Sequence, residues 1–202
     1  RHGQSQWNLE NRFTGWKNVP LTEKGETEAK KAGELIKKHN ISIDRVFSSV
    51  LERANRTAEI AIKKAELNNL LENNKIIMTC SEKLNERDYG DLVGLNKQET
   101  ADKFGKDQVH IWRRSYDTPP PNGESLKDVF QRVSPYFKEN IKPLIDKGEN
   151  ILIAAHGNSL RAMMIELGMY KSEEISNIEL PTGSPLCINL DQGRLVDFKY
   201  LD

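Results

Sequence analysis

Two histidines in this chain are each followed by glycine, in "RHG" and in "AAHG", so that His2 and His156 are the first candidates for chemistry. Glycine lets a backbone or a ligand approach closely, and a small polar residue follows each pair within a few positions. Either histidine alone is more often a structural residue, but the two together indicate a site. His39 and His110 lie in polar helical stretches and are expected at the surface.

Several other chemistries lack their sequence patterns. The sequence contains no His-x-x-x-His or Cys-x-x-Cys spacing that would suggest a metal site. A serine hydrolase would need a G-x-S-x-G elbow, and a P-loop enzyme would need a glycine-rich loop ending in Lys and Ser or Thr. Cys80 and Cys187 fall in or beside apolar strand runs, where we expect buried, inert thiols without a disulfide.

The arginines suggest an anion site. The chain has 19 Lys and 11 Arg, so lysine supplies most of its positive charge. Arginine binds phosphate or carboxylate through a planar fork. Seven arginines lie in non-repetitive segments or beside the His-Gly pairs, and we expect about three of them to form only surface ion pairs. They are Arg1, Arg12, Arg53, Arg87, Arg113, Arg114 and Arg161.

The segments between these residues alternate in type. Apolar spacing and a capping Thr22 predict a helix over 21–40, and the same periodicity predicts helices over 50–67 and 158–168. Short apolar runs predict buried strands at 45–49, 76–80 and 151–157, and a closing hairpin is expected over 186–201. The stretches 84–97 and 112–125 have neither period and are expected to be functional loops or helix ends.

This alternation predicts one three-layer α/β/α domain over 1–202 with a mostly parallel central sheet. Ligands of such sheets bind beyond the carboxyl ends of the strands, where His156 and Arg53 are expected. The chain begins with Arg instead of Met, so we expect a few apolar residues upstream of Arg1 to form a further strand that leads to His2.

The balance of charge limits the classes of binding partner. Lys plus Arg is 30 and Asp plus Glu is 30, so the net charge of zero does not favour nucleic acid or an anionic membrane. No apolar run approaches the ~20 residues of a membrane span. We expect a cytoplasmic protein with a local anion site. The sequence allows a homo-oligomer without specifying one.

Longer motifs carry a family resemblance over the whole chain. "RHGQSQWNLENRFTGW", "SSVLERA", "LNERDYGDLVGLNK", "WRRSYD", "NGESL", "AAHGNSLRA" and "LPTGSPL" resemble the cofactor-dependent phosphoglycerate mutases of the histidine phosphatase superfamily. "RHG" marks only the superfamily, whereas "RFTGW", the tyrosine loop and "WRR" are specific to the mutases. The short "TPPPNGES" and the chain end at Asp202 differ from many relatives.

The resemblance implies a role for each matching residue. His2 would be the phosphorylated nucleophile, with Arg1, Arg53 and a protonated His156 around the transferring group, and Glu86 would donate and accept the proton. An ion pair of Glu86 with Arg87 or Lys83 is the structural alternative. The remaining matches would bind substrate; they are Ser5, Asn8, Thr14, Gly15, Arg87, Tyr89, Lys97, Arg113, Arg114, Gly157 and Asn158.

The implied reaction is the interconversion of 3-phosphoglycerate and 2-phosphoglycerate in glycolysis and gluconeogenesis. It would proceed through phosphohistidine, primed by 2,3-bisphosphoglycerate and without a metal. Two alternatives remain open. One is a phosphatase of the same superfamily, in which water takes the phosphoryl group, and the other is a non-catalytic module that binds a phosphorylated ligand.

Overall fold

Strand β1 (Arg45–Ser48) is the middle strand of a three-stranded parallel sheet with the order β4-β1-β5. The computed structural model describes residues 1–202. Phe47 of β1 pairs with Thr79 of β4 (Thr79–Cys80) and with Ile153 of β5 (Ile151–Ala154). Because all three strands run in the same direction, their carboxyl ends lie at one edge of the sheet. The predicted α/β class with a parallel central sheet is confirmed.

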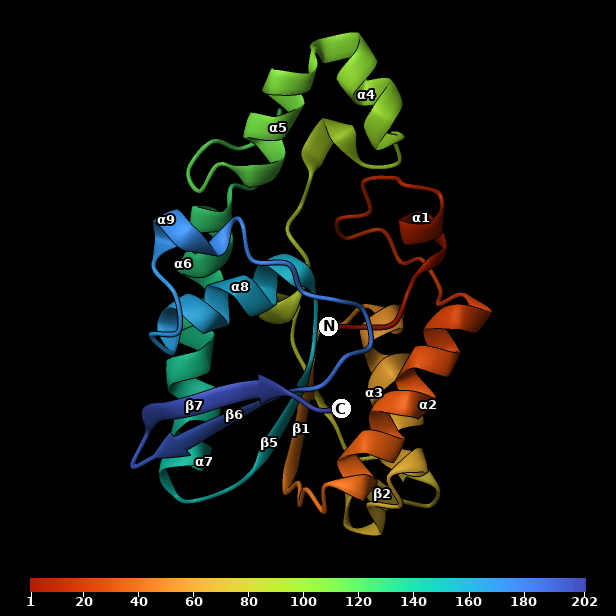
Figure 1. The fold of residues 1–202 in the computed structure, drawn as a ribbon, viewed down its shortest axis with the longest axis vertical. Coiled ribbons are helices and arrows are strands. Elements are labelled where there is room, and N and C mark those ends of the chain that lie inside the picture. Colours follow the sequence, from red (N-terminus) through yellow and green to blue (C-terminus); the bar gives the residue numbers. More distant parts are fainter.

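Helices cover both faces of this sheet (Figure 1). Successive side chains of a strand point to opposite faces, so Val46 packs in the cluster with Ile36 and Ile62, whereas Phe47 packs in the cluster with Val133 and Met163. The helices and helical turns are α1 (Gln6–Leu9), α2 (Glu23–Lys38), α3 (Glu52–Lys64), η1 (Asn68–Leu70), η2 (Glu82–Leu84), η3 (Gly90–Leu92), α4 (Lys97–Phe104), α5 (Lys106–Arg114), α6 (Leu126–Tyr136), η4 (Phe137–Ile141), α7 (Lys142–Asp146), α8 (Gly157–Glu166) and α9 (Ser172–Ile175).

The predicted helices form where their patterns indicate them. The Thr22 hydroxyl accepts a hydrogen bond from the Gly25 N–H at the start of α2, and Ala29, Ala32 and Ile36 are buried. Helix α3 starts after the short loop that follows β1, and α8 starts after the two residues that follow β5. Both helices therefore begin at the carboxyl edge of the sheet.

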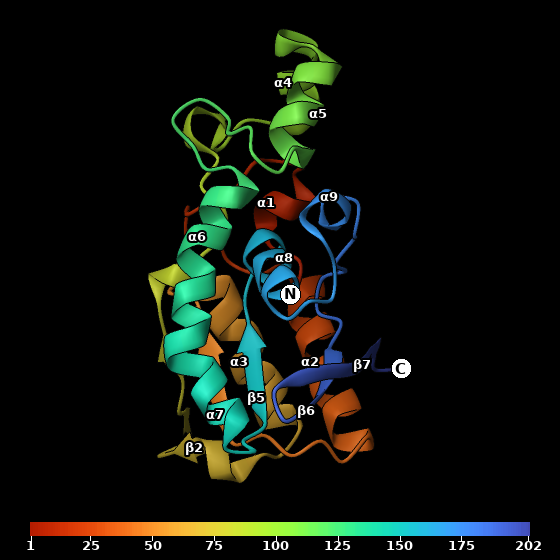
Figure 2. The ribbon, with the colours of Figure 1, turned by 90° about the vertical axis from the view of Figure 1, so that its left-hand side faces the viewer.

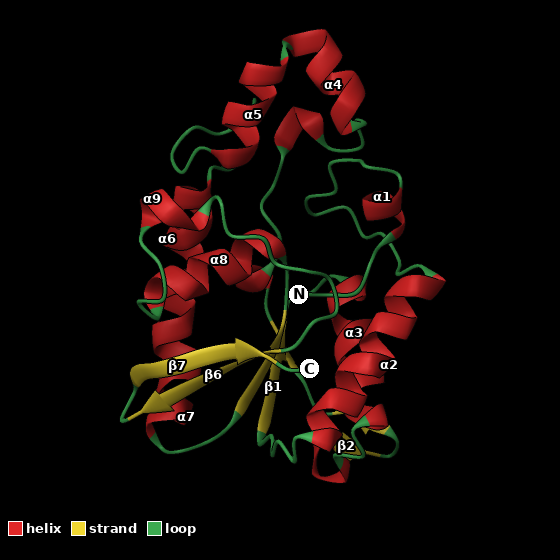
Figure 3. Cartoon of the chain, viewed as in Figure 1, coloured by secondary structure: helices red, strands yellow, loops and turns green.

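Two further pairs of strands lie outside the central sheet. β6 (Leu186–Asp191) and β7 (Arg194–Tyr200) form the expected antiparallel hairpin (Figure 3). β2 (Leu71–Glu72) and β3 (Lys75–Ile76) form a short second hairpin.

The prediction of one buried strand at 76–80 is wrong. The run is divided between β3, which pairs with β2, and β4, which pairs with β1. Because β4 is an edge strand with a single partner, Cys80 is exposed, and Cys187 is half-buried, so the expectation of two core thiols also fails. Both cysteines are free.

The two non-periodic stretches lead into and out of α4 and α5. These helices project beyond the rest of the molecule (Figure 2). The first stretch contains η3 and ends at the first residue of α4, and the second begins in the last turn of α5. No helix in the structure is both long and apolar enough to cross a membrane.

Candidate active site

His2 is held at the carboxyl end of β5. Its backbone N–H donates to the carbonyl of Ala155 at 3.0 Å, and its carbonyl accepts from the N–H of Gly183 at 3.2 Å. A Cβ on Gly3 would lie 2.3 Å from the carbonyl oxygen of Gly25, so only glycine permits this close approach to α2. The His2 side chain is almost completely buried at 2% exposure.

The His2 ring has a defined tautomer. Nδ1 lies 2.6 Å from the carbonyl oxygen of Gly3, which can only accept, so the proton is assigned to Nδ1. Nε2 therefore carries the lone pair. This matches the requirement for a neutral imidazole nucleophile whose second nitrogen is fixed by an acceptor.

His156 lies beside His2, with the ring centroids 5.1 Å apart. It lies two residues after the end of β5, and its Nε2 lies 2.7 Å from the hydroxyl oxygen of Ser49, just beyond the carboxyl end of β1. That hydroxyl accepts from the N–H of Leu51 at 3.1 Å. The Nδ1 atom of His156 is buried and has no hydrogen-bond partner.

The surroundings of both histidines lower their pKa values and so favour the neutral form. Burial lowers the pKa of His2 well below its ordinary value, and the charges of Arg53 and Arg1 lower it further. Burial, then Arg53, then His2 lower the pKa of His156 in the same way. A protonated His156 is therefore disfavoured in the unliganded site, because a buried cation beside two arginines is unfavourable, and the protonated state expected during the transfer stays a prediction.

Arg1 and Arg53 add positive charge to this pocket without a carboxylate partner. Arg53, 1% exposed, donates to the carbonyls of Lys17 and Gly15 at 2.9 and 2.8 Å. Burial lowers the pKa of Arg53 to about 10, Glu86 opposes this effect and Arg1 adds to it. Arg1 donates to the carbonyl of Leu180 at 2.9 Å, and its Nε is buried without a partner. We call Arg1, His2, Arg53 and His156 the histidine centre.

Glu86 lies at the side of the histidine centre. Its Oε1 accepts the backbone N–H of Arg87 at 2.8 Å and that of Asn158 at 3.2 Å. A Cβ on Gly157 would lie 3.8 Å from Oε2 of Glu86 and 3.9 Å from Nε of Arg1, so these groups meet around Gly157. No ion pair joins Glu86 to Arg87 or Lys83. The structural alternative for Glu86 is therefore not observed.

A second group of cations lies towards α5. Arg87 is buried, donates to the carbonyl of Trp112 and has a buried Nε without a partner. Its guanidinium lies 4.9 Å from the ring centroid of Tyr89, whose hydroxyl accepts from the side-chain amide of Asn158 at 3.3 Å. A small hollow brings several site candidates together; its lining is Arg87, Arg113, Arg114, Ser115, Leu126, Asn158, Arg161 and Ser176.

Lys97, Arg113 and Arg114 form the outer part of this group of cations. We call these three residues the arginine arm. Burial, then the charges of Arg113 and Arg1, lower the pKa of Lys97 to about 8. Arg114 donates to the carbonyl of Ser176 at 2.9 Å and pairs with Glu179 at 2.8 Å. Arg113 is exposed and forms no ion pair.

The polar residues before α2 have local structural roles. The Ser5 hydroxyl and the Asn8 side chain cap α1 by accepting each other's backbone N–H at 3.2 and 3.0 Å. Gly15 has a φ of +54° and supplies the carbonyl that accepts from Arg53, and Thr14 is buried. The substrate contacts expected of these residues stay predictions.

Only some of the seven candidate arginines form ion pairs at the surface. Of the seven candidates, Arg12 pairs with Glu10 at 2.8 Å and Arg114 pairs with Glu179. His110 is exposed, and His39 is half-buried with its Nε2 2.9 Å from the carbonyl oxygen of Asp202. No group of three or more His, Cys, Asp or Glu side chains is arranged to hold a metal ion.

Two residues near the site, Ser49 and Arg132, were not identified from the sequence, whereas Arg161 was one of the seven arginine candidates. Ser49 orients His156, and its position at the end of a predicted strand was an available signal. Arg161 donates to the carbonyl of Ile178 at 2.9 Å and lines the small hollow. Arg132 contacts the chain around Glu86, and its position within a helix gave no indication of this.

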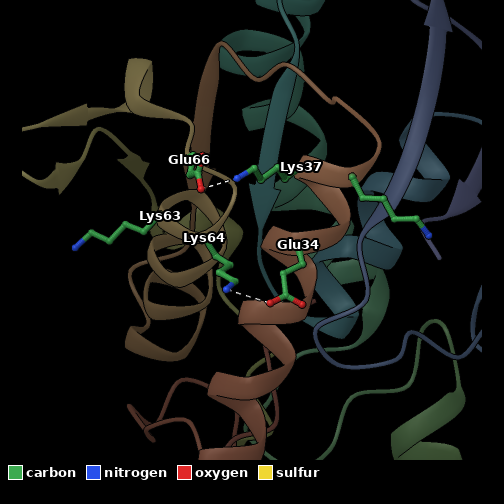
Figure 4. Close-up of a pocket in the computed structure, with 6 residues that line it drawn as sticks. Glu34, Lys37, Lys63, Lys64 and Glu66 are labelled. Carbon is green, nitrogen blue, oxygen red and sulfur yellow. Dashed lines mark ion pairs between the residues drawn. The ribbon is translucent and has the colours of Figure 1, made fainter.

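A separate polar groove lies at the opposite end of α2 and α3 (Figure 4). It is lined by Glu34, Lys37, Lys38, Lys63, Lys64 and Glu66. Lys37 pairs with Glu66 at 2.5 Å and Lys64 with Glu34 at 3.1 Å. Because carboxylates compensate these lysines, the groove is an exposed network of ion pairs on the surface.

The model of the histidine phosphatase superfamily (branch 1) matches residues 1–198. The chain belongs to this superfamily. The 2,3-bisphosphoglycerate-dependent phosphoglycerate mutase of Methylobacterium sp. (strain 4-46) is 50% identical over 199 residues, which cover 98% of this chain and 93% of that protein. The phosphoglycerate mutase of Schizosaccharomyces pombe is 50% identical over 203 residues, covering 100% and 93%.

Solved structures share the fold of this superfamily member. The structure titled Bacillus stearothermophilus YhfR has a TM-score of 0.77 at 28% identity and covers 97% of this chain and 91% of its own. A mycobacterial glucosyl-3-phosphoglycerate phosphatase has a TM-score of 0.77 at 22% identity, covering 99% and 94%. These structures show the fold, and the relatives that are about half identical confirm the resemblance to the cofactor-dependent phosphoglycerate mutases.

Proposed function

We propose that this protein is a 2,3-bisphosphoglycerate-dependent phosphoglycerate mutase, which interconverts 3-phosphoglycerate and 2-phosphoglycerate through phospho-His2. The observation that carries the proposal is the His2 ring, whose Nδ1 is committed to the Gly3 carbonyl while Nε2 keeps its lone pair. Relatives about half identical over nearly the full chain, all named phosphoglycerate mutases, support the same function.

The site fits a ligand with two anionic ends. Three buried nitrogens lack hydrogen-bond partners: Nε of Arg1, Nδ1 of His156 and Nε of Arg87. Two belong to the histidine centre, and the third belongs to the group of cations that includes the arginine arm. Unpaired buried donors are costly unless a ligand satisfies them. We therefore assign 2,3-bisphosphoglycerate as the primer, which supplies the first phosphoryl group.

His2 carries out the covalent step. Its Nε2 forms a bond to phosphorus while the bond from phosphorus to the ester oxygen breaks, and the electron pair of that bond stays on the departing oxygen. Glu86 in its carboxylic acid form gives its proton to that oxygen. In the return transfer, the Glu86 carboxylate takes the proton of the attacking hydroxyl. Carriage of this proton is the proposed role of Glu86.

The other members of the histidine centre stabilise the transferring group. The Ser49 hydroxyl accepts from the N–H of Leu51, so its own proton is free to be donated to Nε2 of His156. His156 then carries its proton on Nδ1 and can donate it to a phosphoryl oxygen without being a cation. Arg1 and Arg53 supply the positive charge that the transition state requires.

We propose a binding role for the remaining candidates. Lys97, Arg113 and Arg114 would hold the substrate carboxylate and the phosphate that is not transferred. Ser5, Asn8, Thr14, Gly15, Arg87, Tyr89, Gly157 and Asn158 would complete the pocket. We propose that residues 1–202 form one catalytic domain and that the protein works in the cytoplasm, in glycolysis and gluconeogenesis, without a metal.

Phosphorus NMR tests the function directly. The protein is incubated with 3-phosphoglycerate, a trace of 2,3-bisphosphoglycerate and excess chelator, and His2→Asn is the matched control. We expect 2-phosphoglycerate to accumulate much faster than inorganic phosphate in the wild type only. Dominant phosphate release would assign the protein to the phosphatases of its superfamily, and loss of turnover in chelator would overturn the metal-free mechanism.

A further inference from the structure

All N–H groups of the Arg132 guanidinium, on α6, donate hydrogen bonds to one segment of main chain and to one carboxylate. Its side chain is 12% exposed, and its Nε and Nη2 donate to the two carboxylate oxygens of Glu124 at 2.8 and 2.9 Å. Its Nη1 donates to the carbonyls of Lys83 and Asn85 at 2.9 and 3.1 Å, and Nη2 also donates to the carbonyl of Glu86 at 2.9 Å. Arginine has five N–H donors, and here each has an acceptor.

The segment that Arg132 holds has little regular structure of its own. The short turn η2 precedes Asn85, and residues 85–89 form neither helix nor strand. The Asn85 side chain accepts from the N–H of Val50 at 3.2 Å, which ties the segment to the loop after β1. Arg132 therefore supplies three of the main-chain hydrogen bonds that secondary structure would otherwise provide.

The carbonyl of Glu86 is fixed from two sides. Trp16 donates its indole N–H to this oxygen at 2.6 Å, and the guanidinium of Arg132 lies 5.6 Å from the centroid of the Trp16 ring. The carboxylate of the same residue accepts from the N–H groups of Arg87 and Asn158. The direction of the Glu86 side chain thus depends on a backbone that Arg132 holds in place.

We propose that Arg132 is a positioning residue for the proton transfer by Glu86, an inference that rests on the role given to Glu86 in the proposed function. Arg132 sets the backbone from which the carboxyl group reaches the departing oxygen. Glu124 orients the guanidinium and accepts the N–H of Asp88 at 2.9 Å, on the far side of Glu86. Lysine cannot replace this arrangement, because its three donors cannot serve one carboxylate and three carbonyls together.

A double-mutant cycle tests this inference. The rate of His2 phosphorylation by 2,3-bisphosphoglycerate is measured in a single turnover for Arg132→Met, Glu86→Gln and the double variant. We expect Arg132→Met to slow the step about 100-fold, as misplacement of a reacting group by about 1 Å does. In the Glu86→Gln background, where no proton is donated, the same change should slow it by less than about 3-fold.

Matched variants separate positioning from charge and folding. Arg56→Met removes an arginine that forms exposed ion pairs with Glu26 and Glu59, and it should leave the rate unchanged. Arg132→Lys keeps the charge and should give an intermediate rate. Glu124→Gln keeps the shape of the side chain that orients the Arg132 guanidinium, so it tests the inference if Arg132→Met fails to fold. It should slow phosphorylation of His2 about 3- to 10-fold, and again only where Glu86 is intact.

The outcomes distinguish this inference from the proposed function. If Arg132→Met and Glu124→Gln slow the step equally in both backgrounds, Arg132 acts on the fold in general and the inference is wrong. If Arg132→Met matches Arg56→Met while Glu86→Gln is slow, only the inference fails. A Glu86→Gln variant as fast as the wild type would remove the proposed role of Glu86 itself, and the inference with it.

Discussion

The histidine centre and the arginine arm both gather positive charge, but they hold it in different ways. Arg53 in the histidine centre is buried and donates only to main-chain carbonyls. In the arginine arm, the Arg114 side chain is 28% exposed and pairs with Glu179, and Arg113 is exposed. A buried centre suits a fixed transition state, whereas the more exposed arginines at the end of α5 suit a substrate that has to turn between two transfers.

His2→Asn should have the largest effect, because it removes the atom that forms the bond to phosphorus. We expect mutase activity to fall by about 10⁴-fold or more. Intact-protein and peptide mass analysis after brief exposure to 2,3-bisphosphoglycerate should find an acid-labile phosphate on His2 in the wild type and none in the variant. A phosphate on Ser5, Ser159 or Cys187 would contradict the assignment.

Arg53→Met should have the next largest effect. Its charge is held by uncharged carbonyls and remains available to the transferring group, so we expect kcat to fall by about 10²- to 10³-fold with a smaller change in KM. Arg56→Met, on the same helix but exposed, is the control and should retain wild-type kinetics. An equal fall in kcat in the two variants would mean that Arg53 does not contribute specifically to the transfer step.

Replacing Arg113 and Arg114 together by Ala should act mainly on binding. The loss of charge-assisted contacts should raise KM about 10-fold or more and favour release of inorganic phosphate over 2-phosphoglycerate. Phosphorylation of His2 should stay measurable, because the histidine centre is intact. Phosphorus NMR gives the ratio of the two products, and an unchanged ratio would show that the arginine arm does not retain the substrate.

The smallest effect concerns stability and pH. The pKa values of His2 and His156 lie well below their ordinary value in the folded protein, mainly because both are buried. The unfolded chain, in which a histidine has a pKa of about 6.5, therefore binds more protons as the pH falls below that value. Stability should drop on acidification by up to about 1.4 kcal/mol per pH unit for each histidine.

Urea unfolding at pH 7.5 and pH 5.5 measures this dependence. The double variant His2→Asn, His156→Gln should lose less stability on acidification than the wild type. The exposed His110→Gln is the control and should behave as the wild type does. An unchanged dependence in the double variant would mean that the two histidines are not buried as neutral groups.

Local patterns predicted a large part of the fold. The capped helix α2, the strand β1 with its following helix, and the β6–β7 hairpin all follow from periodicity and turn residues. The division of 76–80 between two short strands was not predictable in this way. A short edge strand and a buried central strand can have the same apolar composition. Which of the two forms depends on the strands that pair with it in the folded protein.

The candidate site was predictable where a motif names the residue. The resemblance indicated the two histidines, Glu86 and the paired arginines. The low pKa of His156 in the unliganded site was not predictable, because it depends on burial and on Arg53, which lies far away in the sequence. Arg132 was missed for a similar reason, since its main-chain acceptors lie 46 to 49 residues earlier in the chain.

The sequence alone determined the inventory of this protein: alternating strands and helices, a balanced charge, two His-Gly pairs and arginines placed outside the regular repeats. Those features are local, because they depend on residue type and on spacing within a few turns. The tertiary structure decided the tautomer of His2, the lowered pKa values of both histidines and the hydrogen bond from Arg132 to the carbonyl of Glu86. Each of these depends on which carbonyl, hydroxyl or charge lies within a few ångströms, and such neighbours come from distant parts of the chain.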